Sequence, residues 1–232
     1  MSAVDLHARK VKSHEEYIQN ISDITMSFSQ SEKEKILACT KQADEFYKKM
    51  KSVIYSNASN DSVSEYYKLL DGERIAGFPW KFGLTHKKDK KDYEDGLPHT
   101  RKDIIFLSKE QLVYNDIDLT NTLIHEKLHI YQRYNKVLMQ QIIKDMNYAI
   151  LDMNTLNKNE KELIRCNPDL DGNIYYDRLS NKMMICKYNS TTPKNISDVE
   201  ISNFSIEHPY EMMAYEIASL FYKENLNTYK NI

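Results

Sequence analysis

The chain has 232 residues, a formal net charge of −2 and a mean hydropathy of −0.66. This length allows a substantial hydrophobic core, and the charge argues against nucleic acid as a partner. No apolar run approaches the ~20 residues that a membrane helix needs, and the N-terminus lacks the apolar segment of a secretory signal. We therefore expect an intracellular, cytoplasmic protein with no membrane partner. Cys39, Cys166 and Cys186 are odd in number and far apart, which favours reduced thiols.

The first quarter of the chain predicts an N-terminal helical region, residues 1–55. Apolar residues fall near helical spacing up to about Met50, and the segment from Ser31 to Glu34 offers a capping box. This region either covers the rest of the protein or acts as a propeptide or partner-binding helix. Residues 56–62 are rich in turn formers and indicate a linker, so we place a second domain, which holds the motifs described below, at residues 63–232.

Two strand-like runs follow, at residues 75–84 and 102–107. The polar segment between them, residues 86–96, predicts an exposed hairpin loop. The second run leads into a Ser-x-x-Gln sequence at residues 108–111, which has the form of a capping box and predicts a helix start. His99 precedes the second run and is a candidate substrate or oxyanion contact, although a lone histidine at a strand start is more often structural.

The segment His125–His129 has the pattern H-E-x-x-H. A helix turns ~100° per residue, so histidines four positions apart lie on one face and can hold a single metal ion. Glu126 then lies beside the metal, where it can deprotonate an activated water. The apolar periodicity predicts a helix from Asp118 or Thr120 to at least Tyr134, continuing to about residue 146. Alternatively, the two histidines merely belong to the polar face of an amphipathic helix.

A catalytic zinc needs a third protein ligand. Residues 130–135 contain no histidine, which excludes the metzincin continuation of the pattern. The other common choice is a glutamate on a later helix, and Glu211 is the best candidate. Pro209 suits a first helical turn and makes His208 the predicted N-cap.

Ala214 and Ala218 lie on the same predicted helix face as Glu211. Their small side chains would let this helix approach the first one closely, which a short glutamate side chain requires. In the alternative, Glu211 only complements the positive end of the helix dipole. Glu207 and Glu216 are further candidates, but neither has such small neighbours.

Between the two metal-binding helices, we expect a helical stretch towards Leu163 and an insert at residues 165–203. The acidic segment 169–173 predicts a turn, because the glutamate that a calcium loop needs at its last position is replaced by Ser180. Residues 174–176 and 183–188 predict a hairpin that could form a wall of a substrate cleft.

Together, residues 122–133 and 207–218 resemble the gluzincin class of zinc metallopeptidases. More narrowly, residues 96–101, 122–129, 167–169 and 208–211 resemble uncharacterised metallopeptidase-like proteins of large DNA viruses, which implies a viral or virion-associated location. The resemblance implies an α+β, mainly helical, zincin-like domain with a small antiparallel sheet beside the active-site helix. In that class an extended peptide pairs with a strand at the cleft edge, and residues 102–107 occupy the expected place in the order of elements.

The resemblance further implies Zn²⁺ on His125, His129 and Glu211, with Glu126 as the catalytic carboxylate. One position departs from the pattern: thermolysin-like members often have an aspartate where this chain has Tyr215. The group that orients the histidine ligands is therefore left open.

The predicted function is zinc-dependent hydrolysis of peptide bonds, with a peptide or protein as substrate. Candidate donors to the oxyanion are His208, Tyr210 and Tyr215, among which the sequence does not choose. Three rivals remain: an inactive zinc-binding scaffold, a DNA-associated SprT-like protease, and a helical protein with an accidental pentad. The second of these usually has a further histidine ligand and a basic segment, and neither is evident here. No sequence feature indicates an oligomeric state.

Overall fold

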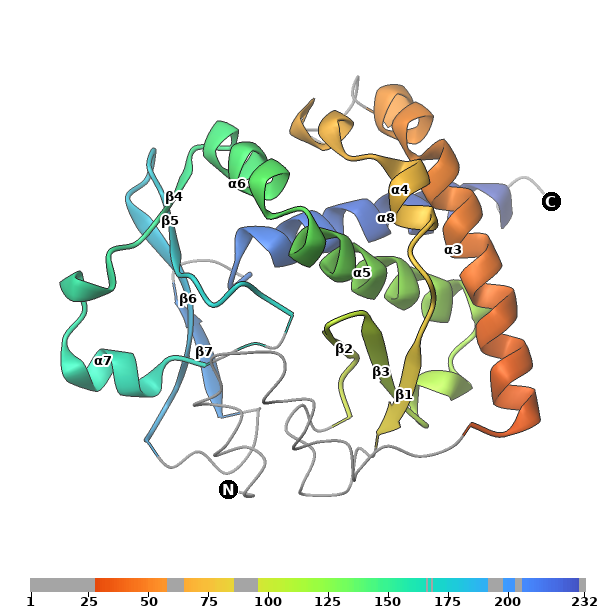
Figure 1. The fold of residues 1–232 in the computed structure, drawn as a ribbon, viewed down its shortest axis with the longest axis horizontal. Coiled ribbons are helices and arrows are strands. Elements are labelled where there is room, and N and C mark those ends of the chain that lie inside the picture. Colours follow the sequence, from red (N-terminus) through yellow and green to blue (C-terminus); the bar gives the residue numbers. More distant parts are fainter. Residues whose placement is uncertain are drawn as a thin grey trace.

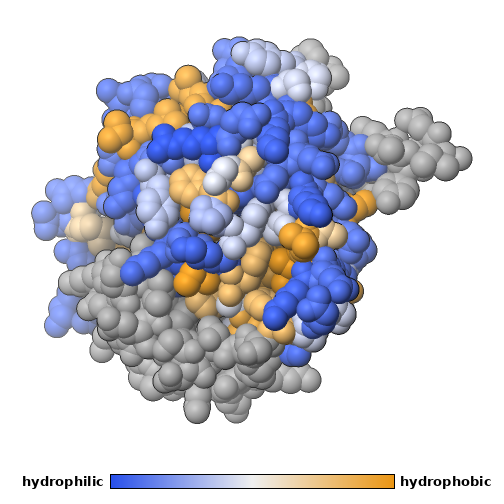
Figure 2. Space-filling model, turned by 45° about the vertical axis from the view of Figure 1, so that its right-hand side comes forward, coloured by the Kyte–Doolittle hydropathy of each residue, from blue (hydrophilic) through white to orange (hydrophobic). Residues whose placement is uncertain are grey.

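The computed structural model describes residues 28–57, 65–85, 96–165, 167, 169–191, 198–202 and 206–229. It is a mixed structure of helices and small sheets (Figure 1). Its longest helices are α3 (Gln30–Asn57), α5 (Asp116–Tyr134) and α8 (Pro209–Tyr229). None of the helices in the described ranges is both long and apolar enough to cross a bilayer. Figure 2 shows a face that is largely hydrophilic, with apolar patches between the polar side chains.

The shorter helical elements are η2 (Glu65–Leu69), α4 (Gly72–Ala76), η3 (Gln111–Val113), α6 (Lys136–Asp145), η4 (Met153–Thr155) and α7 (Lys158–Leu163). The strands are β1 (Phe82–Thr85), β2 (His99–Arg101), β3 (Ile104–Ser108), β4 (Tyr148–Ile150), β5 (Tyr175–Asp177), β6 (Lys182–Tyr188) and β7 (Val199–Ser202).

The first sheet has the order β1-β3-β2, with β1 parallel and β2 antiparallel to β3. The predicted hairpin between residues 75–84 and 102–107 is therefore wrong, and the sheet is mixed rather than antiparallel. The tight turn at Lys102 and Asp103, with Lys102 at φ 52°, folds β3 back on β2 and leaves the other edge of β3 for β1. Most of the predicted loop, residues 86–95, lies outside the described residues.

The second sheet has the order β4-β5-β6-β7, and all its pairs are antiparallel. It lies on the far side of α5 from α3 (Figure 1). The pairing of β5 with β6 confirms the hairpin expected in the insert. The turn expected before β5 is also present, where the backbone N–H of Asn173 donates to Asp171 Oδ1 at 2.9 Å.

The helix starts differ from those predicted. At the start of α3 the capping box joins Ser29 and Glu32, each backbone N–H donating to the other side chain, rather than Ser31 and Glu34. The N-cap of α5 is Asn115, whose side chain accepts from the N–H of Asp118 at 2.9 Å. Ser108 belongs to β3, so no capping box forms there and only the short turn η3 follows.

The helix that carries the H-E-x-x-H segment ends at Tyr134, which was the shortest extent predicted. It does not continue to residue 146. Asn135 leaves helical geometry at φ −124° and ψ 44°, and its side-chain amide donates to the carbonyl of Tyr131 at 2.7 Å. Asparagine side chains compete with the backbone in this way, and α6 starts in a new direction at Lys136. The stretch expected towards Leu163 is only the short helix α7, because β4 and η4 intervene.

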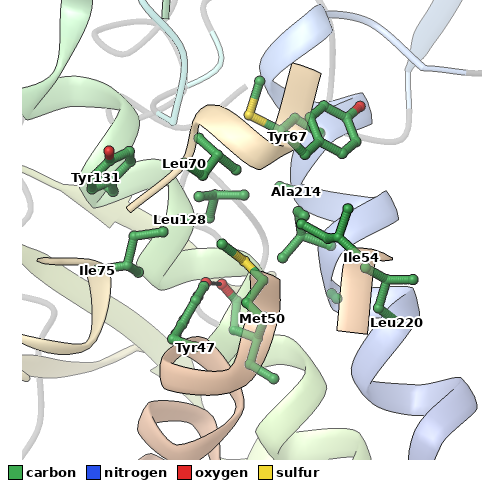
Figure 3. Close-up of a cluster of buried hydrophobic side chains, with 14 of the residues drawn as sticks. Tyr47, Met50, Ile54, Tyr67, Leu70, Ile75, Leu128, Tyr131, Ala214 and Leu220 are labelled. Carbon is green, nitrogen blue, oxygen red and sulfur yellow. Dashed lines mark hydrogen bonds between the residues drawn. The ribbon is translucent and has the colours of Figure 1, made fainter. Parts of the chain in front are cut away.

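The main core lies where α3, α5 and α8 meet, and Figure 3 shows its side chains converging. Met50 and Ile54 of α3, Leu128 of α5 and Leu220 of α8 are all buried in it. Tyr47 adds a hydrogen bond from its hydroxyl to the carbonyl of Ile124. Helix α3 therefore shares one core with the two helices that carry the pentad and Glu211. Cys39 and Cys186 are buried and unbridged, while Cys166 lies outside the described residues.

Lys127, inside the pentad, is buried on the α3 side of α5. Its ammonium lies 2.7 Å from Asp44 Oδ1 and 3.9 Å from the centre of the Trp80 ring. Burial lowers the pKa of Lys127, and the neighbouring Asp44 offsets part of this effect. Trp80 Nε1–H donates to the other oxygen of Asp44 at 3.0 Å, so two partly buried side chains enclose the buried ammonium of Lys127 in one cluster. This cluster fixes the rotation of α5 and hence the direction in which its histidines point.

Replacing Ala214 with leucine should destabilise the protein, because Ala214 is completely buried beside α5 and α3. Overpacking of this kind costs ~1–3 kcal/mol. Urea denaturation followed by circular dichroism measures the change. The control is Lys223→Leu on the exposed side of the same helix, which should change the free energy of unfolding by less than ~0.5 kcal/mol. Equal stability of the two variants would contradict close packing of α8.

Candidate metal centre

His125, His129 and Glu211 meet between α5 and α8, and together they could hold a metal ion. The two Nε2 atoms lie 3.0 Å apart. Glu211 Oε2 lies 3.2 Å from His125 Nε2, and Glu211 Oε1 lies 3.6 Å from His129 Nε2. Glu211 is the third residue of α8, which begins at Pro209, as the sequence predicts. The structure thus brings together all three residues predicted as ligands, from positions 86 residues apart at the widest.

The buried charges of this group depend on one another. Burial alone would lower the pKa of His129, but the carboxylate of Glu211 outweighs it and raises the pKa to about 9. Burial would likewise raise the pKa of Glu211, yet His129 and His125 hold it well below its usual value. The carboxylate is therefore ionised, and positive charge is favoured at the point where the three side chains meet.

Gln132 orients His129. Its amide nitrogen donates to the carbonyl of Tyr210 at 3.1 Å, so its oxygen must face His129 Nδ1, 2.8 Å away. Because that oxygen can only accept, Nδ1 carries a hydrogen, and Nε2 is the nitrogen that would give up its proton to bind a metal ion beside Glu211 and His125. Gln132 is fully buried and also ties α5 to the first turn of α8.

Asn167 and Arg165 hold the carboxylates on the other side. Asn167 Nδ2 donates to Glu211 Oε1 at 3.1 Å and also to Glu207 Oε1. Arg165 Nη1 donates to the same Glu207 oxygen at 2.8 Å. Glu211 is thus fixed by an amide while Glu207 is neutralised by a guanidinium. Neither carboxylate is free to rotate away from this arrangement.

A cavity of about 310 Å³ opens beside the three residues. Its lining includes Glu126, which is almost fully buried, and Tyr215, which is 57% exposed. The ring of Tyr215 meets that of His125 edge to face, with 4.5 Å between the ring centres. The rings of His125 and His129 are similarly close, with 4.7 Å between their centres. Burial, with Glu211 nearby, raises the pKa of Tyr215 to about 12, so its hydroxyl keeps its proton at neutral pH.

Three other predicted contacts do not line this cavity. His99 is buried, stacks on Phe106 and has its Nδ1 2.9 Å from the carbonyl of Leu97. Burial lowers its pKa to about 4, which leaves the ring neutral. His208 caps α8, since its Nδ1 accepts from the N–H of Tyr210 at 3.0 Å, while Tyr210 itself is buried in the main core. Among the predicted donors, only Tyr215 reaches the cavity.

The sequence does not predict that four further residues belong to the site, namely Gln132, Arg165, Asn167 and Asp169. Gln132 lies three residues after His129, a spacing that allows contact on a helix, and this is a usable signal. The other three belong to an irregular segment whose path the sequence does not reveal. Glu216, considered as a ligand, is half-buried on another side of α8, beside Tyr67.

Comparison with known proteins adds no family to this description. The chain matches no protein-family model, no curated protein and no solved structure.

Proposed function

We propose that this chain is a zinc-dependent peptidase with a zincin-like fold. The observation that carries the proposal is the convergence of His125, His129 and Glu211 beside a cavity that His125, Glu211 and Glu126 line. Metal binding alone requires only the three ligands. Hydrolysis also requires a general base, and a buried carboxylate that faces the cavity beside the ligands can take that role.

The donor atoms suit zinc. Two imidazole nitrogens and one carboxylate oxygen form the His₂Glu set of catalytic zinc, which leaves a fourth position open. Ligands ~2.0–2.1 Å from a tetrahedral ion lie ~3.3 Å from each other. The observed separations of 3.0, 3.2 and 3.6 Å are close to this value. Calcium and magnesium prefer all-oxygen sets, which disfavours both here.

Zinc held here would supply a Lewis acid that polarises a peptide carbonyl and acidifies water. Glu126 would take the proton from the attacking water and pass it to the leaving amine. The water's oxygen bonds to the carbonyl carbon, the C–N bond breaks, and the products are a carboxylic acid and an amine. Gln132 keeps His129 in the tautomer that binds metal through Nε2.

Tyr215 is the donor we propose for the oxyanion that forms during attack. It lines the cavity beside His125, and its raised pKa keeps the hydroxyl able to donate. It follows Glu211 by one helical turn, so ligand and donor are placed by the same rigid helix. This position is the one where the sequence departs from the thermolysin-like pattern.

Purified protein should contain about one zinc per chain, and Glu211→Ala or His129→Ala should lose it, because two ligands remain where three are needed. Mass spectrometric metal analysis after dialysis measures the content. The matched control is Glu162→Ala, at an exposed glutamate on α7, which should keep zinc at the wild-type level. Unchanged zinc in the Glu211 variant would remove that residue from the ligand set.

Replacing Glu126 with glutamine should keep zinc bound and lower kcat by ~10²–10⁴-fold, the range for loss of a general base. The assay combines metal analysis with cleavage of a peptide library read by mass spectrometry. Wild-type turnover in this variant would refute the mechanism. Stoichiometric zinc without cleavage by the wild type would instead favour an inactive zinc-binding scaffold.

Gln132→Ala should weaken zinc binding by ~10–100-fold, because His129 loses the acceptor that fixes its tautomer. Competition with a chromophoric chelator measures the affinity. The control is Gln141→Ala, at an exposed glutamine on α6, which should bind zinc like the wild type. Equal affinities for both variants would show that Gln132 serves only to join the helices.

A further inference from the structure

The strand beside the cavity is β2, since Leu97 and Pro98 line the cavity directly before it. It is an edge strand, because the sheet order is β1-β3-β2. An edge strand next to a catalytic site can take an extended peptide as an additional strand, through its outward N–H and C=O groups. Whether β2 can do so depends on what its outward backbone groups already bind.

Thr100 is the residue of β2 whose backbone faces outwards. It lies opposite Ile105, whose own N–H points to the other side of β3 and donates to the carbonyl of Lys81 at 2.8 Å. In an antiparallel pair both backbone groups of a residue point the same way, so Thr100 directs its N–H and C=O away from β3.

Both outward groups of Thr100 are taken by side chains. Its N–H donates to Asp169 Oδ1 at 2.5 Å, and the same oxygen accepts from the Thr100 hydroxyl at 2.7 Å. Its carbonyl accepts from Arg101 Nη1 at 2.8 Å. All three residues of β2 are buried, and Thr100 is 0% exposed, which is unusual for an edge strand.

The neighbouring outward positions are two residues away in either direction. Pro98 has no N–H to donate. The carbonyl of Lys102 accepts from Arg133 Nη1, and Arg133 Nη2 also donates to the Thr100 hydroxyl at 2.8 Å. At Thr100, both backbone groups that an extended substrate would pair with are thus already used, and on either side the Lys102 carbonyl is used and Pro98 offers no N–H.

The cavity itself is small and anionic. Its volume of about 310 Å³ is at the lower end of the range for small-ligand sites, ~300–1,000 Å³. Its lining holds four carboxylates, those of Glu126, Asp169, Glu207 and Glu211, and one guanidinium, Arg165, which is paired with Glu207. With the Zn²⁺ ion proposed above, the site therefore keeps one net negative charge. Such a lining attracts a cationic group and repels a terminal carboxylate.

We infer that the site takes short peptides by their free amino end and does not cleave extended interior segments laid along β2. This inference rests on the proposed peptidase function and assigns a substrate class to it. Asp169 is the residue that excludes the longer substrates, by occupying the Thr100 N–H.

The test compares substrates that share one scissile bond. They are a tetrapeptide with free ends, its N-acetyl and C-amide forms, and a peptide of about twelve residues blocked at both ends, which at ~3.3 Å per residue extends past β2. We expect kcat/KM to fall at least ~10-fold on N-acetylation and in the long peptide, and to change less than ~3-fold on C-amidation.

Binding gives a second readout that does not depend on turnover. The Glu126→Gln protein should bind the tetrapeptide with free ends, and it should bind the long blocked peptide at least ~10-fold more weakly. Calorimetry measures both affinities. In the same protein the Thr100 amide should exchange slowly with solvent, because Asp169 holds it.

Asp169→Ala should release the Thr100 N–H, speed its exchange, and raise the ratio of long-peptide to tetrapeptide kcat/KM. Asp169→Asn is the matched comparison, because both variants lose the charge of Asp169 but only asparagine can still accept from the Thr100 N–H. The ratio should therefore be higher in the alanine variant than in the asparagine variant. Circular dichroism and zinc content establish that both variants are folded.

Efficient cleavage of the long blocked peptide by the wild type would overturn the inference while leaving the peptidase function intact. A greater loss on C-amidation than on N-acetylation would overturn the preference for the amino end. Absence of cleavage of every peptide, with zinc bound, would overturn the proposed function and this inference with it.

Discussion

The candidate site depends on how closely α8 approaches α5. A glutamate side chain is short, so Glu211 can reach the two histidines only if the helix backbones lie near each other. Ala214 and Ala218 permit that approach because their side chains are small and buried. The hydrogen bond from Gln132 to the carbonyl of Tyr210 then sets the first turn of α8 against the histidines. Packing and polar contacts therefore impose the same geometry.

Three alternate residues of one irregular segment connect the rest of the protein to this helix pair. Asn167 donates to Glu211, Asp169 accepts from Thr100 of β2, and Asp171 lies 3.3 Å from His208, the cap of α8. Asp171 also accepts from the hydroxyl of Tyr175 in the second sheet. The segment thus joins both sheets to the start of α8. A change in its path would move Glu211 and uncover the edge of β2 at once.

The parts predicted correctly from the sequence are those specified by local periodicity. The spacing of His125 and His129, the position of Pro209 and the small residues after Glu211 all follow from helix geometry, and they sufficed to nominate three ligands. Errors arose where two local signals competed. Ser29 with Glu32 and Ser31 with Glu34 have the same capping pattern, and Asn135 interrupts a periodicity that otherwise continues.

Contacts between distant segments could not be predicted in the same way. The parallel pairing of β1 with β3 depends on β2 taking the other edge, which no local pattern reveals. The partners of Asn167 and Asp169 depend on the path of an irregular segment, where side-chain direction has no fixed period. Gln132 lies between these cases: its spacing from His129 is regular, but its second partner, Tyr210, lies on another helix.

The charge around the cavity favours the binding of a cation, and this argument does not depend on ligand geometry. Glu126, Asp169 and Glu211 are all buried, and an ionised carboxylate loses several kcal/mol of hydration on burial. Arg133 and Arg101 lie near Asp169, and Arg165 is committed to Glu207, so Glu211 is left with the two histidines. A divalent ion between the two imidazole rings would balance the charges of Glu126 and Glu211 better than one proton does. Zinc would then contribute to the stability of the α5 and α8 pair as well as to catalysis, because an ion that binds only the folded chain stabilises it.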